Sequence, residues 1–174
     1  MEHHTRIETE VKLKVPSLDG LQARLEAMGF VLRIPPLPES SVLWDRGKEL
    51  LIQGSALRLR RFAGKAWLTW KGPKIPDATL KIRPEQETEI ADADAMERIL
   101  QALGYTPVVR MVKTRAVLRR ADLEACLDET PFGCYLELEG DAAVIHEAMA
   151  TLGIGPEVAE PRSYPTLYRE HGLA

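Results

Sequence analysis

The chain has 174 residues, of which 45% are hydrophobic and 28% charged, and its 26 acidic and 23 basic residues give a net charge of −3. A disordered chain has fewer apolar residues and a larger charge imbalance, and a binder of duplex DNA is usually basic overall. No apolar run approaches the roughly 20 residues that cross a bilayer, and the first residues lack the apolar stretch of a signal peptide. We therefore expect a cytoplasmic protein with no membrane partner and a single domain over residues 1–174.

Residues 7–15 alternate with a period of two, which predicts a strand with Ile7, Val11, Leu13 and Val15 on one face and Glu8, Glu10, Lys12 and Lys14 on the other. Ser17 is the expected cap of a helix that ends at Gly29. Residues 33–41 contain three prolines, and this composition predicts a loop or an irregular edge. The N-terminal part of the chain is therefore expected to contribute a strand, a helix and then irregular structure.

The remaining elements follow from the same patterns. Up to residue 104 we expect a short strand at 41–45, a turn at 46–48, a hairpin across 56–71, a strand at 79–90 with a bulge or edge at Pro84, and a helix at 92–104. Beyond it we expect a long hairpin formed by 108–119 and 123–128, a strand at 133–139, a helix at 141–153 and a short final helix carrying Tyr164 and Tyr168.

A short internal repeat runs through these elements. Three times a Glu-x-Glu strand is followed by a helix that stops at a glycine. The carboxylate pairs are Glu8 with Glu10, Glu87 with Glu89, and Glu137 with Glu139. We expect two related halves closed by a partial third unit.

Cysteine and histidine are sparse. Cys126 and Cys134 form no CxxC pair, so we expect two free, partly buried thiols, as in a reducing compartment. Of the four histidines, His3, His4 and His171 lie near the ends and His146 lies in an amphipathic segment. A zinc site or a histidine-based triad therefore has little support.

Charged side chains gather on single faces of the predicted strands, because a period of two places alternate residues on one side. Besides the acidic pairs, this applies to three basic pairs, which are Arg58 with Arg60, Lys81 with Arg83, and Lys113 with Arg115. Asp128 shares a face with Glu124 and Cys126. The simplest interpretation is the solvated face of an antiparallel sheet. Such faces usually mix Ser, Thr, Gln and Lys, whereas these strands carry charges sorted by sign.

The alternative is a sheet closed into a barrel with a charged interior and helices over its outer face. Burying so many charges is costly unless water or a ligand fills the space, so a charged interior indicates a ligand site. Carboxylate pairs without His or Cys favour hard cations such as Mg²⁺ or Mn²⁺. Clustered Arg and Lys favour phosphate oxygens. A polyphosphate bound with a divalent metal suits both sets, and neither GxxxxGK[ST] nor GxGxxG occurs in the sequence.

Seven segments of the chain carry a resemblance to a known family. Glu8-Thr9-Glu10-Val11-Lys12 is similar to the ExExK signature of the CYTH family, the triphosphate tunnel metalloenzymes, which include class IV adenylyl cyclases, thiamine triphosphatases and inorganic triphosphatases. Six further segments of the chain resemble the family's later motifs in the same order, and they are residues 56–60, 68–73, 83–89, 113–115, 128–139 and 163–164. The similarity covers about residues 7–168. Leu43-Trp44-Asp45 stands where the family often has Tyr-Phe-Asp, so a tyrosine hydroxyl sometimes placed near the attacking water is missing.

The resemblance implies an α+β fold, in which an eight-stranded antiparallel closed β-barrel forms a tunnel with a charged interior, flanked by about three to four helices. It implies catalytic roles for Glu8, Glu10 and Lys12. The implied phosphate-binding residues are Lys12, Arg58, Arg60, Lys71, Arg83, Lys113 and Arg115. The implied ligands for one or two Mg²⁺ or Mn²⁺ ions are Glu8, Glu10, Glu137 and Glu139, with Glu87, Glu89 and Asp128 as further acids. Lys14 and Lys81 have no clear family counterpart and are expected to be solvated.

Three functions are compatible with this pattern. The leading hypothesis is a divalent-metal-dependent hydrolase of inorganic triphosphate or of a triphosphate ester such as thiamine triphosphate or a nucleoside triphosphate. One alternative is a class IV adenylyl cyclase, in which the ribose 3′-hydroxyl attacks the α-phosphate of ATP to give cyclic AMP. A second is a non-catalytic polyphosphate-binding protein, which should have lost a metal carboxylate, and all of them are present. The expected partner is a small-molecule triphosphate and not a nucleic acid duplex, with the protein a monomer or homodimer.

Overall fold

Eight strands form a closed antiparallel barrel in the computed structural model, which describes residues 6–173. The strands are β1 (Arg6–Val15), β2 (Val31–Asp45), β3 (Ala56–Phe62), β4 (Lys65–Lys71), β5 (Lys81–Ile90), β6 (Thr106–Arg120), β7 (Leu123–Thr130) and β8 (Gly133–Glu139). Their order around the barrel is β1-β5-β4-β3-β2-β6-β7-β8, and the pairing of β8 with β1 closes it. The fold class predicted from the sequence is confirmed.

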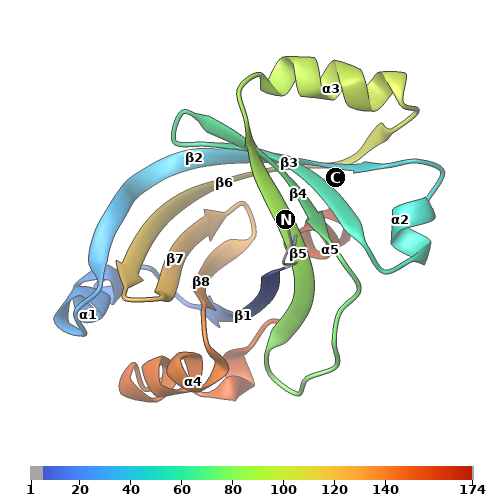
Figure 1. The fold of residues 1–174 in the computed structure, drawn as a ribbon. Helices are drawn as coiled ribbons and strands as arrows, with labels where there is room; N and C mark the ends of the chain where they lie inside the picture. The colour runs from blue at the N-terminus through green and yellow to red at the C-terminus, as the bar shows by residue number, and fades with distance from the viewer. Residues whose placement is uncertain (1–5, 174) are drawn as a thin grey trace.

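Helices flank the barrel on several sides. They are α1 (Leu21–Ala27), α2 (Glu49–Ile52), α3 (Ala93–Ala102), α4 (Ala142–Thr151) and α5 (Tyr164–Glu170), with a 3₁₀ turn at Pro156–Val158. In Figure 1, α3 lies on one side of the barrel, and α1 and α4 lie on the opposite side. The three Glu-x-Glu strands, β1, β5 and β8, are followed by α1, α3 and α4, which confirms the repeat. None of the helices within residues 6–173 is long and apolar enough to cross a bilayer.

The outer face of the barrel is apolar where helices cover it. In β1, Val11 and Leu13 are at most 1% exposed and pack in one cluster with Leu25 of α1 and Ile145 of α4. The charged residues that alternate with this face, Glu8, Glu10 and Lys12, instead line the cavity inside the barrel. The alternation of β1 is thus apolar outward and charged inward, which confirms the barrel with a charged interior.

Replacing Ile145 with valine tests how well this cluster is packed. Ile145 is fully buried, so we expect Ile145→Val to lower the free energy of unfolding by about 1 kcal/mol, measured by urea denaturation. Ile99 of α3 is 51% exposed, and Ile99→Val is the matched control, with an expected change near zero. Equal losses at the two positions would contradict the assignment of Ile145 to the core.

The proline-rich segment forms the first half of β2, so of the two forms predicted for residues 33–41 the irregular edge is confirmed and the loop is wrong. Pro35, Pro36 and Pro38 precede the first residue of β2 that pairs with β3, which is Glu39, and this half pairs with β6 alone. A proline cannot donate a ladder hydrogen bond, and here one side of the strand needs no such donor. Register shifts between Leu32 and Leu37 accommodate the irregular backbone.

Smaller predictions also need correction. The cap of α1 is Gly20 and not Ser17, whose hydroxyl accepts from the Asp19 amide instead. Pro84 pairs with Ile7 without a bulge, one residue beyond the last β4 partner of β5. The turn at 46–48 leads into α2, which the sequence analysis missed because one helical turn carries no periodic pattern.

Several local predictions hold. α1 and α3 are each followed at the predicted position by a glycine with positive φ, 87° at Gly29 and 85° at Gly104, a conformation that glycine adopts at no steric cost. Cys126 and Cys134 are free, the first buried and the second partly buried. His146 lies exposed on α4, and His3 and His4 fall outside the described residues.

Candidate active site

A cavity of about 1000 Å³ runs inside the barrel, lined by the inward side chains of its strands. Of the residues implied by the family resemblance, the following line it: Glu8, Glu10, Lys12, Arg58, Arg60, Lys71, Arg83, Glu87, Lys113, Arg115, Glu137 and Glu139. Leu43 also lines it, so the position where the family often has tyrosine offers no hydroxyl. The barrel therefore brings acidic and basic residues from distant parts of the chain into one space.

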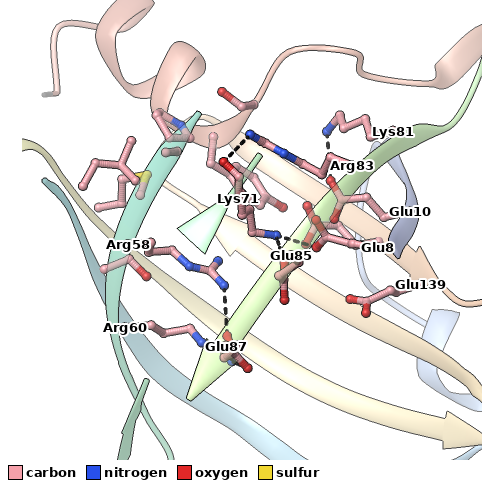
Figure 2. Close-up of a pocket in the computed structure, with 18 of the residues that line it drawn as sticks. Glu8, Glu10, Arg58, Arg60, Lys71, Lys81, Arg83, Glu85, Glu87 and Glu139 are labelled. Atoms are coloured by element: carbon pink, nitrogen blue, oxygen red, sulfur yellow. Dashed lines mark hydrogen bonds and ion pairs between the residues drawn. The ribbon is translucent and has the colours of Figure 1, made fainter. Parts of the chain in front are cut away.

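The acidic side of the cavity is formed mainly by β1 and β5. Lys71 of β4 joins two of its carboxylates, with Nζ 2.5 Å from Glu8 and 2.6 Å from Glu85. Figure 2 shows this ammonium group between the two carboxylates, with Glu10 beside Glu8. Glu139 of β8 lies directly opposite Glu10 in the register of β1 and β8. Four carboxylates thus share a small region with three cations, because Lys81 also lies 3.4 Å from Glu10 and Arg6 lies 2.6 Å from Glu139.

This crowding of acids changes the ionisation of Glu8. Burial and the neighbouring Glu10 raise the pKa of Glu8 to about 7, although Lys71 opposes the shift. Because the folded-state pKa lies above the ordinary value of 4.5, ionising Glu8 costs stability, and the cost accumulates as the pH rises from about 4.5 to 7. A bound cation would offset that cost.

Lys12 of β1 and Lys81 of β5 both line the cavity, and their side chains lie next to each other. Burial lowers the pKa of Lys12 to about 7, even though its Nζ lies 3.9 Å from Glu137. Burial also disfavours the charge of Lys81, but Glu10 and Glu137 outweigh it, so the pKa of Lys81 is raised. Lys81 was expected to be solvated, and this prediction is wrong because its position in β5 faces the cavity. Lys14 is exposed, as expected.

The basic side of the cavity begins on β3. Arg58 and Arg60 both approach Glu87 of β5, at 3.6 and 3.3 Å, as Figure 2 shows. The guanidinium of Arg60 also stacks over the Trp67 ring, 4.6 Å from its centroid. Both arginines keep a buried Nε without a hydrogen-bond partner among the described residues. These donors are therefore available to an anion.

A second group of basic side chains, Lys113 and Arg115, is hydrogen-bonded to Asp128, which is fully buried. Its carboxylate accepts from Arg115 at 2.7 and 2.6 Å, from Lys113 at 2.8 Å and from the Tyr164 hydroxyl at 2.6 Å. The Tyr164 ring lies beneath both Lys12 and Lys113, 3.9 and 4.2 Å from their ammonium nitrogens. Asp128 and Tyr164 thereby orient the cations that face the cavity.

Two of the implied metal ligands are not brought together with Glu8 and Glu10. Asp128 is outside the cavity lining and is saturated by its donors. Glu89, near the end of β5, is also outside the lining and pairs with Lys65 at 2.8 Å, both side chains being more than half exposed. Glu137 lines the cavity, but its carboxylate contacts Arg115 and Lys12. Its surroundings are those of a counter-ion to the basic residues.

Arg83 lines the cavity, and its guanidinium donates hydrogen bonds to backbone carbonyl oxygens. It donates to the carbonyl oxygens of Gly72 at 2.8 Å, Lys71 at 3.1 Å and Gly54 at 3.4 Å. Arg83 therefore joins the start of the β4–β5 connection to the loop before β3. Its role in phosphate binding stays a prediction.

Some cavity residues were missed by the sequence analysis. Glu85 shares the inward face of β5 with Lys81, Arg83 and Glu87, so the period of two contained the signal. Glu39 and Ser41 were missed because the prolines before them predicted a loop. Both lie on β2 and line the cavity.

The donor set of the acidic side fits a hard divalent cation. Glu8, Glu10 and Glu139 offer carboxylate oxygens, and the raised pKa of Glu8 marks a site where added positive charge is favourable. Among the described residues, no three side chains of the metal-binding types converge closely enough to enclose an ion on their own. Mg²⁺ typically takes one or two carboxylates and completes its shell with water and phosphate oxygens. The residues present therefore fit a metal that binds together with a phosphate ligand.

The segment before α5 is fastened to β1. The Glu160 amide donates to the Lys12 carbonyl at 2.7 Å, and Lys12 Nζ donates to the Arg162 carbonyl at 2.9 Å. The Glu160 carboxylate accepts from the Arg162 guanidinium at 2.7 and 2.5 Å. These contacts hold Tyr164 in place beside the basic residues.

The stability contributed by Glu160 should depend on pH. Hydrogen bonds from Arg162 lower the pKa of Glu160 to about 2, so its contribution is present above pH 4.5 and is lost as the pH falls toward 2. We expect Glu160→Gln to be less stable than the native protein near pH 7, with the difference shrinking between pH 4.5 and 2. Urea denaturation at pH 7, 4.5 and 2.5 measures this. Glu157→Gln, at an exposed position of the same segment, is the control, and a constant difference would contradict the prediction.

Comparisons with known proteins agree with the geometry of the cavity. The model of the CYTH domain matches residues 6–164. The chain belongs to the CYTH domain family. A relative from Methanocaldococcus jannaschii, provisionally named an adenylate cyclase, is 32% identical over 142 residues, which are 81% of each chain.

Solved structures share the barrel. A protein from Pyrococcus horikoshii is 28% identical, with a TM-score of 0.77 over 94% of this chain and 99% of that one. A second match, from Hippeastrum, is 19% identical, with a TM-score of 0.70 over 94% of this chain and 96% of that one. That protein is provisionally named an adenylyl cyclase, and its described activity is dominantly that of a triphosphatase. At this identity the likeness concerns the fold.

Proposed function

We propose that this CYTH domain protein is a divalent-metal-dependent hydrolase of triphosphate substrates. The observation that carries the proposal is the division of one cavity into an acidic side around Glu8 and Glu10 and a basic side around Arg58, Arg60 and Arg115. A polyphosphate chain bound with Mg²⁺ or Mn²⁺ matches both sides at once. The triphosphatase activity described for the Hippeastrum protein supports the same reaction class.

The basic residues would bind the phosphates and stabilise the negative charge that spreads in the transition state. Arg58 and Arg60 keep unpaired Nε donors, and Arg115 is held by Asp128 before any ligand arrives. A site that is ordered in advance does not have to reorganise as the charge develops. The rigid barrel wall therefore supplies orientation as well as charge.

The acidic residues would hold the metal, which when bound neutralises phosphate charge and activates water or steadies the leaving group. Glu8 and Glu10 share the inward face of β1, and Glu139 on the neighbouring strand β8 is the register partner of Glu10. Lys12 Nζ can hold or release a proton near neutral pH, because burial lowers its pKa to about 7. In the overall reaction water attacks phosphorus in line and the phosphoanhydride oxygen leaves.

One product assay separates the candidate functions. The protein is incubated with tripolyphosphate, thiamine triphosphate or ATP, each with Mg²⁺ or Mn²⁺, and orthophosphate, pyrophosphate and cyclic AMP are measured. We expect metal-dependent release of phosphate from at least one substrate and no cyclic AMP. Cyclic AMP as the main product of ATP would replace this proposal with adenylyl cyclase activity. No turnover of any substrate would favour a polyphosphate-binding protein.

A further inference from the structure

One carboxylate of the cavity, Glu39 on β2, lies among basic side chains and away from the acidic side. Its register partner on β6 is Lys113, and on β3 it pairs with Phe62, two residues from Arg60. Glu39 is 4% exposed and lines the cavity. It therefore introduces a negative charge into the wall that the proposed function assigns to phosphate binding.

The contacts of Glu39 are those of a shared counter-ion. Its carboxylate oxygens lie 3.6 Å from Lys113 Nζ, 3.8 Å from Arg115 Nε and 3.8 Å from Arg60 Nη1. These separations exceed ordinary hydrogen-bond lengths, and Oε2 has no hydrogen-bond partner among the described residues. Glu39 therefore forms no close pair with any one of these cations, and its charge is shared among the three.

The neighbouring donors are only partly satisfied. Ser41 Oγ, two residues along β2, is buried and has no hydrogen-bond partner among residues 6–173. The Nε atoms of Arg58 and Arg60 are likewise buried without a hydrogen-bond partner among these residues. Buried donors without acceptors are costly, so this wall is suited to a further anion beside Glu39.

Glu39 remains ionised throughout the neutral range. Burial on its own disfavours the charge, but the nearby cations outweigh it and lower the pKa to about 2; they are Lys113, Arg115, Arg58 and Arg60. An anion that enters this wall must therefore share its cations with a fixed carboxylate. Like charges at such short range in a poorly solvated site weaken each other's binding.

We propose that Glu39 is a specificity-determining residue that limits how tightly the tunnel holds small phosphate anions and so promotes the release of product. This inference rests on the proposed function, because the anion concerned is a product of triphosphate hydrolysis. A basic wall without Glu39 would bind pyrophosphate more tightly and become subject to inhibition by it. The negative charge of Glu39 offsets part of the attraction between the basic wall and pyrophosphate.

The test measures pyrophosphate binding to the folded protein in metal-free buffer, by calorimetry, for Glu39→Gln and the native chain. We expect the dissociation constant to fall at least about tenfold in the variant, because one like charge is removed. We also expect a lower melting temperature without ligand, since Lys113, Arg115 and Arg60 each lose one of the carboxylates beside them. A residue that is only structural would lower the melting temperature without tightening the binding. Glu89→Gln, outside the cavity, is the matched control and should bind as the native protein does.

A second variant keeps the proposal testable if Glu39→Gln does not fold. Ser41→Asp adds a negative charge next to the same cations and should weaken pyrophosphate binding at least about tenfold. Unchanged or weaker binding in Glu39→Gln, or unchanged binding in Ser41→Asp, would overturn the role of Glu39. If the native protein hydrolyses triphosphate while these variants bind pyrophosphate as it does, only this inference fails. If the native protein neither binds pyrophosphate nor hydrolyses any triphosphate, the proposed function fails as well.

Discussion

Changing Glu8 and Glu10 together to glutamine is expected to abolish metal-dependent triphosphate turnover while the barrel stays folded. In the proposed function these two cavity-lining carboxylates hold the metal, and a neutral amide oxygen binds a hard divalent cation more weakly than a carboxylate does. We expect the rate of phosphate release to fall by about 10³-fold or more. Phosphate release at saturating Mg²⁺ or Mn²⁺ measures the effect.

The same variant should not be less stable than the native protein. The charge on Glu8 is unfavourable in the folded state, because burial and Glu10 raise its pKa to about 7. Neutral side chains at both positions remove this repulsion, so the melting temperature should stay the same or rise near pH 7. Glu89→Gln serves as the control for both measurements. Wild-type turnover in the double variant would show that the metal assignment is wrong.

Asp128→Asn should produce the largest loss of stability. Asp128 is fully buried and accepts hydrogen bonds from Arg115, Lys113 and Tyr164, so its charge is the main compensation for two buried cations. Removing one partner of a buried pair leaves an uncompensated charge. We expect the free energy of unfolding to fall by about 3–5 kcal/mol at pH 7, measured by urea denaturation.

An exposed aspartate provides the comparison. Asp94 on α3 pairs with Arg61 at 2.6 Å, but its side chain is 79% exposed. Exposed ion pairs contribute little, so Asp94→Asn should cost less than about 1 kcal/mol. If Asp128→Asn costs no more than Asp94→Asn, the buried network does not hold the basic residues as described.

Sequence periodicity predicted the parts of the site that lie on regular strands. The period of two in β1 predicted that Glu8, Glu10 and Lys12 share a face, and the structure places that face inside the barrel. The pattern of β1 alone did not indicate whether its charged face points to solvent or into a barrel. The inward orientation was inferred because acids and bases are separated by strand over the whole sheet, which is seldom seen on a solvated face.

Apart from Glu85, whose strand carried the period-two signal, the errors lie where local patterns conflict with tertiary pairing. Prolines in β2 predicted a loop that hid Glu39, and the strand forms because that half pairs on one side only. Asp128 and Glu137 were assigned to the metal by resemblance, but their contacts with Arg115 depend on the register of β6, β7 and β8. Sequence spacing indicates which side of a strand a residue occupies, and not which neighbour it meets.

The most direct test of the account is a crystal structure of the protein with tripolyphosphate and Mn²⁺, with anomalous scattering measured to locate the metal. We expect the phosphate chain inside the barrel, in contact with Arg58, Arg60 and Arg115, and a manganese peak between it and the carboxylates of Glu8 and Glu10. A barrel that is empty at saturating ligand, or phosphate bound only to the outer surface, would contradict the account.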